Sequence, residues 1–324
     1  MSSSAVRTAT DLDDYVTAVR PAVEITITGR GGFTASVTRI DLPRLWMQRG
    51  CERLPRVWHA GPSPERNIIS FLTQAGPGTV MNGVEMRSTD IALHSPDHAY
   101  RHRSVGPLHW GAMSLPVADM AEIGAAVAGR DLMPPRDEQI VTPSAPAMAK
   151  LQRLHAAAGQ LAETAPEIIA NPEAARGLEQ ALIEAMVDCI GEPDRRQDRA
   201  AHRRHTAIVQ RFRAALEPSD GRAVYLPELC AAIGVSGRML RLCCQEHLGM
   251  SPKRYLLLRR MHLARRALRD GAAAATTVTD IATQFGFWEL GRFAVEYRSL
   301  FGESPSDTLR SATQPYSRSA TAVR

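Results

Sequence analysis

Four histidines lie close together in the first half of the chain, at His94, His98, His102 and His109. Histidine and carboxylate side chains on adjacent strands commonly hold a metal ion inside a β-barrel. Such sites use a tight His-x-His pair followed by a glutamate, and the spacing here does not provide that pair. The pattern favours polar, partly exposed histidines at strand ends. We therefore expect no metal, no other cofactor and no catalytic residue.

A second set of side chains in the same half combines aromatic rings with a few polar groups, which suits a site for a small molecule. The same side chains would also suit a hydrophobic core and its rim, and core is the interpretation that the sequence favours. The candidate pocket residues are Trp46, Trp58, Arg87, Tyr100, Arg103 and Trp110.

The five cysteines are odd in number and show no Cys-x-x-Cys spacing. They argue against a disulfide scaffold or zinc site and for a reducing cytoplasm. The adjacent Cys243 and Cys244 could form a redox switch, but buried structural thiols are the favoured interpretation. The N-terminus has no apolar signal core, so the sequence predicts neither a signal peptide nor a membrane span.

Residues 13–115 contain many short segments of alternating polarity, separated by turn residues such as Gly76-Pro77-Gly78 and Asn82-Gly83. This pattern is typical of a β-sandwich or a small barrel, and a barrel of this size can enclose one small ligand. Residues 1–12 are polar and are predicted to be loose. The predicted strands are 24–28, 33–40, 45–48, 56–59, 67–72, 84–87, 90–94, 100–105 and 109–114.

The strand pattern ends at Leu115, and residues 116–190 are predicted to form a helical connector. Ser144–Ala162 and Pro172–Ile190 each place apolar side chains on one stripe. These two helices either pack on the β domain or form a dimer seam. The polar residues 191–203 are the predicted linker between domains.

The last part of the chain contains a helix-turn-helix pattern at Val278–Leu309. An apolar helical face ending at Phe285 is followed by Gly286, which allows a tight turn because glycine tolerates positive φ. A second helix then turns Phe293 and Tyr297 inward and leaves its charged residues outside. This geometry presents a helix to the major groove of DNA.

A similar pattern occurs upstream, at Leu226–Leu242, so the motif is repeated. Gly249-Met250-Ser251-Pro252 recurs as Gly302-Glu303-Ser304-Pro305, where a serine caps and a proline starts the next helix. Between the motifs, Pro252–Leu268 forms a basic helix about 25 Å long at ~1.5 Å per residue. Two such motifs at this separation can occupy adjacent major grooves, about 34 Å apart.

Charge is distributed unevenly along the chain. Residues 201–324 carry 19 Lys and Arg against 10 Asp and Glu, a net charge of +9, whereas residues 1–200 carry 20 against 24, a net charge of −4. This asymmetry indicates an anion-binding C-terminal part, although a solvated basic surface without a partner would give the same count.

The C-terminal part, from about Arg204 to Arg310, resembles the AraC/XylS family of bacterial transcription regulators. The resemblance rests on Gly234-Val235-Ser236 with Leu240, on the paired Gly-x-Ser-Pro segments, and on Asp280-Ile281-Ala282 running into Gly286-Phe287. The first half looks like the effector-binding domain of some members. This resemblance implies a cupin-like barrel that need not hold a metal.

The motif positions of the family imply recognition helices at about 237–246 and 289–299. The residues then expected to read bases are Arg238, Arg241, Leu242, Gln245, Glu289, Gly291, Arg292 and Val295. Arginine can bond two acceptors of guanine and glutamine can read adenine, so the first helix is the richer in base-reading groups. The residues expected at phosphates are Ser236, Ser251, Lys253, Arg298 and Ser304.

Together these features predict an α+β multidomain protein. It would have a cupin-like β-barrel or sandwich at 13–115, a helical connector at 116–190, a linker at 191–203 and an all-α domain with two helix-turn-helix units at 204–310. The expected function is a cytoplasmic, non-enzymatic transcription regulator that binds double-stranded promoter DNA and a small-molecule effector. RNA polymerase and a second copy of the chain are further expected partners. A metal-dependent cupin-type enzyme fused to a DNA-binding domain and a non-specific architectural DNA binder remain the alternatives.

Overall fold

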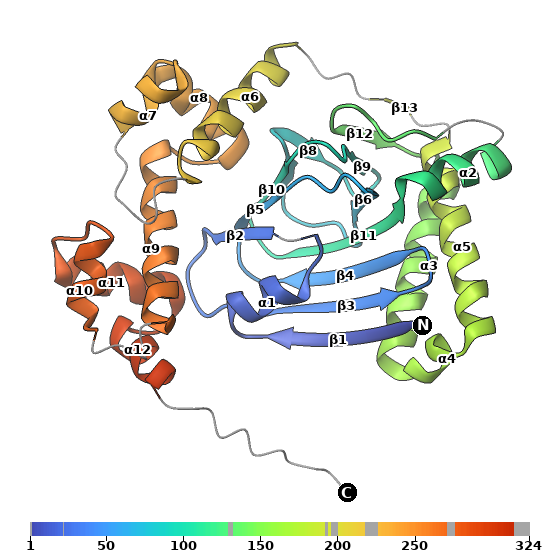
Figure 1. The fold of residues 1–324 in the computed structure, drawn as a ribbon, viewed down its shortest axis with the longest axis horizontal. Helices are drawn as coiled ribbons and strands as arrows, with labels where there is room; N and C mark the ends of the chain where they lie inside the picture. Colours follow the sequence, from blue (N-terminus) through green and yellow to red (C-terminus); the bar gives the residue numbers. More distant parts are fainter. Residues whose placement is uncertain are drawn as a thin grey trace, which may run out of the picture. The chain divides into compact units, whose positions relative to one another are not determined.

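The computed structural model of the chain describes residues 2–21, 23–128, 132–191, 194–195, 200–217, 226–270 and 276–313. The chain divides into two compact units, the first built largely from residues up to Ala207 and the second largely from Ile208 onward. Figure 1 labels the helices and strands of both units. Among the described helices, none combines the length and the apolar character that a membrane crossing needs.

The first unit contains two antiparallel sheets, with eight and five strands among the described residues (Figure 1). The order in the larger sheet is β1 (Ser3–Ala9), β3 (Ala35–Asp41), β4 (Trp46–Glu52), β11 (Leu108–Pro116), β6 (Arg66–Leu72), β9 (Ile91–His94), β12 (Gln139–Thr142) and β13 (Asp194–Arg195). The order in the smaller sheet is β2 (Val23–Ile27), β5 (Arg56–Ala60), β10 (Tyr100–Ser104), β7 (Thr79–Met81) and β8 (Val84–Met86).

Side chains on opposite faces of the larger sheet enter two different cores. On β11, Trp110 and Ala112 point to the smaller sheet, whereas Met113 and Leu115 point to a layer of helices. Successive side chains of a strand alternate between faces, so one strand serves both cores. The outer layer consists of α2 (Val117–Ala128), α3 (Ala145–Thr164), α4 (Pro166–Ala170) and α5 (Pro172–Gly191). The unit is thus a β-sandwich with helices on one outer face (Figure 1).

The two amphipathic helices of the connector, α3 and α5, pack on their own sheet. Leu151 and Met148 of α3 and Leu182 and Met186 of α5 are buried in the same core as Met113. Packing on the β domain was one of the two arrangements that the sequence left open, and it accounts for the apolar stripe of each helix.

Three elements of this unit differ from the sequence expectations. Residues 1–12 were predicted to be loose, but Ser3–Ala9 forms the edge strand β1, which pairs with β3. Its side chains are mostly exposed, so the polar composition reflects an edge rather than disorder. Helix α1 (Leu12–Ala18) begins at the Asp11 cap, and β12 extends beside β9 within the connector predicted to be helical. Within the predicted linker, residues 192–193 and 196–199 lie outside the described ones, whereas Asp194–Arg195 forms β13 and a helix begins at Ala200.

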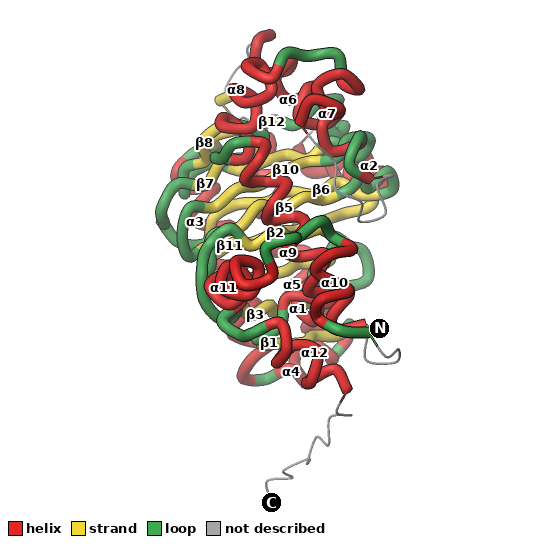
Figure 2. Tube along the Cα trace, turned by 90° about the vertical axis from the view of Figure 1, so that its left-hand side faces the viewer, coloured by secondary structure: helices red, strands yellow, loops and turns green. Residues whose placement is uncertain are grey.

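The second unit is helical, and Figure 2 shows its helices in red. The described helices are α6 (Ala200–Ala214), which begins before the unit boundary, α7 (Leu226–Ile233), α8 (Gly237–Leu248), α9 (Pro252–Asp270), α10 (Val278–Gln284), α11 (Leu290–Phe301) and α12 (Pro305–Thr313). Helices α7 and α8 form the first helix-turn-helix, and α10 and α11 form the second. Helix α9 lies between them in the sequence.

The internal repeat is visible in the backbone. Gly234 and Gly286, at the two turns, have φ values of 67° and 76°, and Gly249 and Gly302 have values of 68° and 79°. Only glycine adopts this left-handed region without strain, which explains its recurrence. Helix α9 buries Leu258 and its apolar neighbours against α10 and α11.

His155 anchors α3 to the larger sheet. Its Nε2–H donates to the Gln48 carbonyl at 3.0 Å, and its ring contacts Phe71 edge-on. Burial, aided by the nearby Arg49 charge, lowers the pKa of His155 to about 3.

This buried histidine makes stability depend on pH. In the unfolded chain His155 binds a proton below about pH 6.5, whereas in the native protein it binds one only as the pH approaches 3. The free energy of unfolding therefore falls as the pH drops through this window. We expect His155 to contribute a slope of about 1.4 kcal/mol per pH unit, and His155→Gln to remove it. Urea unfolding at pH 7.5, 6 and 5 measures the slope. His98→Gln, at an exposed site, should leave it unchanged, and equal slopes in all three proteins would refute the assignment.

Candidate nucleic-acid interface and effector cavity

The outward face of α8 is set by what the helix buries. Ser236 caps the helix by accepting from the Met239 N–H at 3.2 Å, and Leu240, Cys243 and Cys244 are buried. The opposite face therefore exposes the four side chains that the family motif marked as base-reading. These are Arg238, Arg241, Leu242 and Gln245, and together they line one open hollow.

The chemistry of this face suits the major groove of DNA. Within the part of the chain that the structure describes, Arg238 and Arg241 have no ion-pair partner, so their guanidinium groups remain available to guanine or phosphate. Leu242 is 53% exposed, and an apolar side chain in this place can contact a thymine methyl group.

The outward face of α11 is different, because its arginine is already engaged. Phe293, Tyr297 and Leu300 are buried, which exposes Glu289, Gly291, Arg292 and Val295. Arg292 donates to Glu296 at 2.9 Å and to Glu289 at 3.3 Å. These contacts, the Glu296 hydrogen bond first, raise the pKa of Arg292. Two carboxylates around one arginine leave this face without the positive charge that α8 presents.

The residues expected at phosphates fall into two groups. Ser236, Ser251, Lys253 and Arg298 are exposed, and Ser251 also caps α9 by accepting from the Arg254 N–H at 3.3 Å. Ser304 is half-buried, and its hydroxyl donates to Asp307 at 2.6 Å. A phosphate beside that carboxylate would be repelled, so Ser304 is placed for helix capping.

One residue that the sequence analysis did not single out lies at the second motif. Trp288 lies two residues before α11, next to the N-cap Glu289, and is 82% exposed. Apolar periodicity does not reveal Trp288, because the neighbouring Phe287 occupies the core position of the motif.

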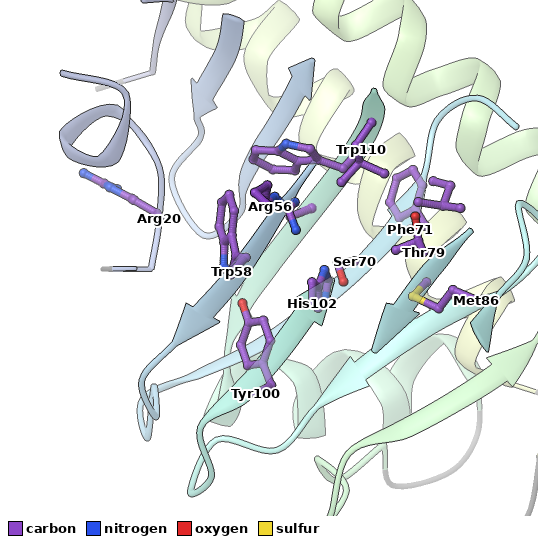
Figure 3. A pocket seen from close by; sticks show the side chains of 13 residues that line it. Arg20, Arg56, Trp58, Ser70, Phe71, Thr79, Met86, Tyr100, His102 and Trp110 are labelled. Carbon is purple, nitrogen blue, oxygen red and sulfur yellow. The ribbon is translucent and has the colours of Figure 1, made fainter. Parts of the chain in front are cut away.

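A small cavity lies between the two sheets of the first unit (Figure 3). Trp58, Tyr100 and Trp110 line it, whereas three other candidate pocket residues do not. Trp46 packs in the core beneath Arg66, and Arg87 is exposed in the turn after β8. Arg103 does not line it because alternation on β10 directs Tyr100 and His102 inward.

Glu52, which the sequence analysis did not mark, organises one wall of this cavity. Its carboxylate accepts from Tyr15 Oη at 2.8 Å, from Trp110 Nε1 at 3.0 Å and from Arg56 Nε at 2.5 Å. Glu52 and Arg56 are both almost completely buried. Burial, together with the Glu52 charge, raises the pKa of Tyr15 well above its usual value, so the phenol stays protonated.

A second buried chain of hydrogen bonds reaches the cavity from the other side. His94 Nδ1 lies 3.0 Å from Glu138, and His94 Nε2 lies 2.8 Å from Ser70 Oγ. The His94 ring stacks on Tyr100 with centroids 3.6 Å apart. Burial and then the Glu138 charge raise the pKa of Tyr100.

The four histidines of the sequence analysis occupy different environments. His94 and His102 have ring centroids 5.7 Å apart, His98 contacts Ser95, and His109 contacts Cys51. No group of three potential metal ligands occurs among the described residues. The five cysteines are free thiols, and burial raises the pKa of Cys189 to about 12.

Gly50 leaves room for the cavity wall. A Cβ atom at this position would lie 2.3 Å from the Trp110 indole, so Gly50→Ala must displace that ring. We expect a loss of about 1–3 kcal/mol in unfolding free energy, measured by urea titration, with an altered near-ultraviolet circular dichroism signal. Gly177→Ala, in an exposed helix with no atom within 4 Å, should instead stabilise the protein by about 0.5–1 kcal/mol. A neutral effect at Gly50 would contradict this packing.

Residues 229–311 match the model of a family described as a helix-turn-helix domain. Over 95 residues the chain is 41% identical to the XylDLEGF operon transcriptional activator of Pseudomonas putida and 40% identical to the probable thc operon regulatory protein of Rhodococcus erythropolis. These matches cover 29% of this chain and 30% and 29% of the two regulators. The solved structure of a probable AraC family transcriptional regulator from Rhodopseudomonas palustris CGA009 is 35% identical, with a TM-score of 0.31, over 33% of this chain and 99% of that one.

The fold and the exposed faces of α8 and α11 define a two-domain protein whose C-terminal unit is a tandem helix-turn-helix domain. In this segment the chain is similar to transcription regulators of the AraC/XylS type, as the sequence motifs predicted. The matched segment spans less than a third of the two curated regulators.

Proposed function

We propose that the protein is a sequence-specific DNA-binding transcription regulator that responds to a small-molecule effector. The observation that carries the proposal is the exposed face of α8. Two arginines without an ion-pair partner among the described residues, a leucine and a glutamine stand together on it. Such a face supplies donors for guanine and adenine and an apolar contact for thymine. The identity to curated operon regulators in the same segment supports this reading.

The effector would bind in the first unit, between the two sheets. Ligand sites are enclosed, mostly apolar and provided with a few polar groups, and the cavity lined by Trp58, Tyr100 and Trp110 has this character. Binding would change the occupancy of DNA half-sites, or the contact with RNA polymerase, only if the two states of the protein differ in affinity for the effector. A homodimer would strengthen binding by presenting two copies of the reading unit.

Sequencing of the DNA bound by the purified full-length protein, followed by footprinting at 50 and 200 mM salt, tests the proposal. We expect one protected sequence at both salt concentrations, with weaker binding at the higher one. Protection of no preferred sequence would indicate a non-specific architectural binder instead. Metal analysis of the same preparation addresses the remaining alternative, since stoichiometric iron, zinc or manganese would indicate a cupin-type enzyme.

A further inference from the structure

The cavity between the sheets has an apolar wall and a polar centre. Trp58, Trp110 and Leu108 supply apolar surface. Figure 3 shows Arg56, Ser70 and His102 directed toward the middle of the cavity, from three different strands. A ligand held there would touch both kinds of surface, so the polar atoms decide which ligand is accepted.

The charges at the centre of the cavity are balanced, because Arg56 is paired with Glu52 at 2.5 Å. Arg20, the other lining arginine, is half-exposed and shares Asp41 with Arg39, at 3.1 Å and 2.8 Å. Burial lowers the pKa of His102 well below its usual value, so the imidazole is neutral near pH 7. At this centre, a ligand group with a net charge would lose its hydration without meeting a free counter-charge.

Two hydrogen-bonding groups, at Arg56 and at Ser70, remain at the centre. Arg56 Nη1 is buried and has no hydrogen-bond partner among the described residues, so it offers an N–H donor. In the neutral form of His94, the Nδ1–H donates to the Glu138 carboxylate, and Nε2 then accepts the Ser70 hydroxyl proton. The lone pairs of Ser70 Oγ are then available as an acceptor. His102 Nε2, also buried without such a partner, can complement either polarity through its tautomers.

We propose that this cavity binds a small, uncharged ligand that carries a hydrogen-bond acceptor facing Arg56 and a donor facing Ser70. A planar primary amide, or another neutral group with the two functions side by side, has this chemistry. The proposal rests on the proposed function, because it names the chemical class of the effector.

The ligand enters by widening the cavity. The volume of the cavity is about 30 Å³, well below the ~150 Å³ that accommodates a benzene ring. Met86, a lining side chain with three rotatable bonds, and the half-exposed Arg20 are the groups that can move without breaking a strand.

Calorimetric titration of the full-length protein with benzamide, acetophenone and benzoate tests the proposal. These probes share a ring and a carbonyl and differ only in the group beside it, which is a neutral donor, a methyl group or an anionic oxygen. We expect benzamide to bind about threefold to tenfold more tightly than acetophenone, because one hydrogen bond is lost. Benzoate should bind more weakly than benzamide, by a factor of about ten or more.

Ser70→Ala should reduce benzamide to the affinity of acetophenone, whereas Ser36→Ala, on a side chain outside the cavity, should preserve the difference. The ranking of the probes on the unaltered protein remains decisive if Ser70→Ala does not fold. The proposal is overturned if benzoate binds as tightly as benzamide, or if no probe binds saturably. Footprinting in parallel distinguishes failure of this inference from failure of the proposed function. A protected operator without probe binding refutes this inference alone, whereas a missing footprint refutes the proposed function.

Discussion

Replacing Glu52 with alanine is expected to lower the free energy of unfolding by about 3–5 kcal/mol. The replacement leaves Arg56 as a buried, uncompensated charge, and it also removes the acceptor of Tyr15 and Trp110. Three segments distant in the sequence, α1, β5 and β11, lose a common anchor. Urea unfolding followed by far-ultraviolet circular dichroism measures the change.

A double replacement provides the control for this prediction. Glu52→Leu with Arg56→Met removes both charges and keeps similar volume, so much of the stability lost in Glu52→Ala should return. Had the loss come from packing alone, the double variant would be no more stable than the single one. A loss below about 1 kcal/mol for Glu52→Ala would show that the pair is not desolvated as the structure has it.

The second large effect concerns the reading face of α8. Arg241→Ala is expected to weaken binding to the preferred operator by about 1–3 kcal/mol and to relax the base preference at one position. Combining it with Arg238→Ala should weaken binding further, because both guanidinium groups stand on the same exposed face. Titration of operator and random DNA by fluorescence anisotropy measures both quantities.

Arg292→Ala is the matched variant on α11. Its guanidinium is already held by Glu289 and Glu296, so its removal should cost less affinity than the removal of Arg241. Equal losses at Arg241 and Arg292 would contradict the assignment of sequence choice to the first motif. An equal loss on operator and random DNA for Arg241→Ala would make that arginine a phosphate contact.

The helix-turn-helix unit could be predicted from the sequence because its signals are local. The apolar spacing, the glycine turns and the Ser-Pro starts each lie within one turn of helix, so Phe293 and Tyr297 could be assigned to the core without knowledge of the fold. The ion pairs of Arg292 with two glutamates were not predicted, since exposed ion pairs depend on side-chain geometry rather than on periodicity.

The cavity could be predicted only in part, because its polar centre depends on strand register. Trp58, Tyr100 and Trp110 were visible as aromatic residues in predicted strands. Glu52 meets Trp110 only because β4 pairs with β11, and the two residues are 58 positions apart. The edge strand β1 was missed for a related reason, since its identity comes from pairing with β3 rather than from its own polar sequence.

The exposed tryptophan at the second motif gives the protein a built-in optical reporter. Of the four tryptophans in the sequence, Trp46, Trp58 and Trp110 are buried in the β unit, and Trp288 is 82% exposed beside α11. Acrylamide should therefore quench Trp288 selectively. Protection from the quencher would then record occupation of the second half-site separately from that of the first, without any added label.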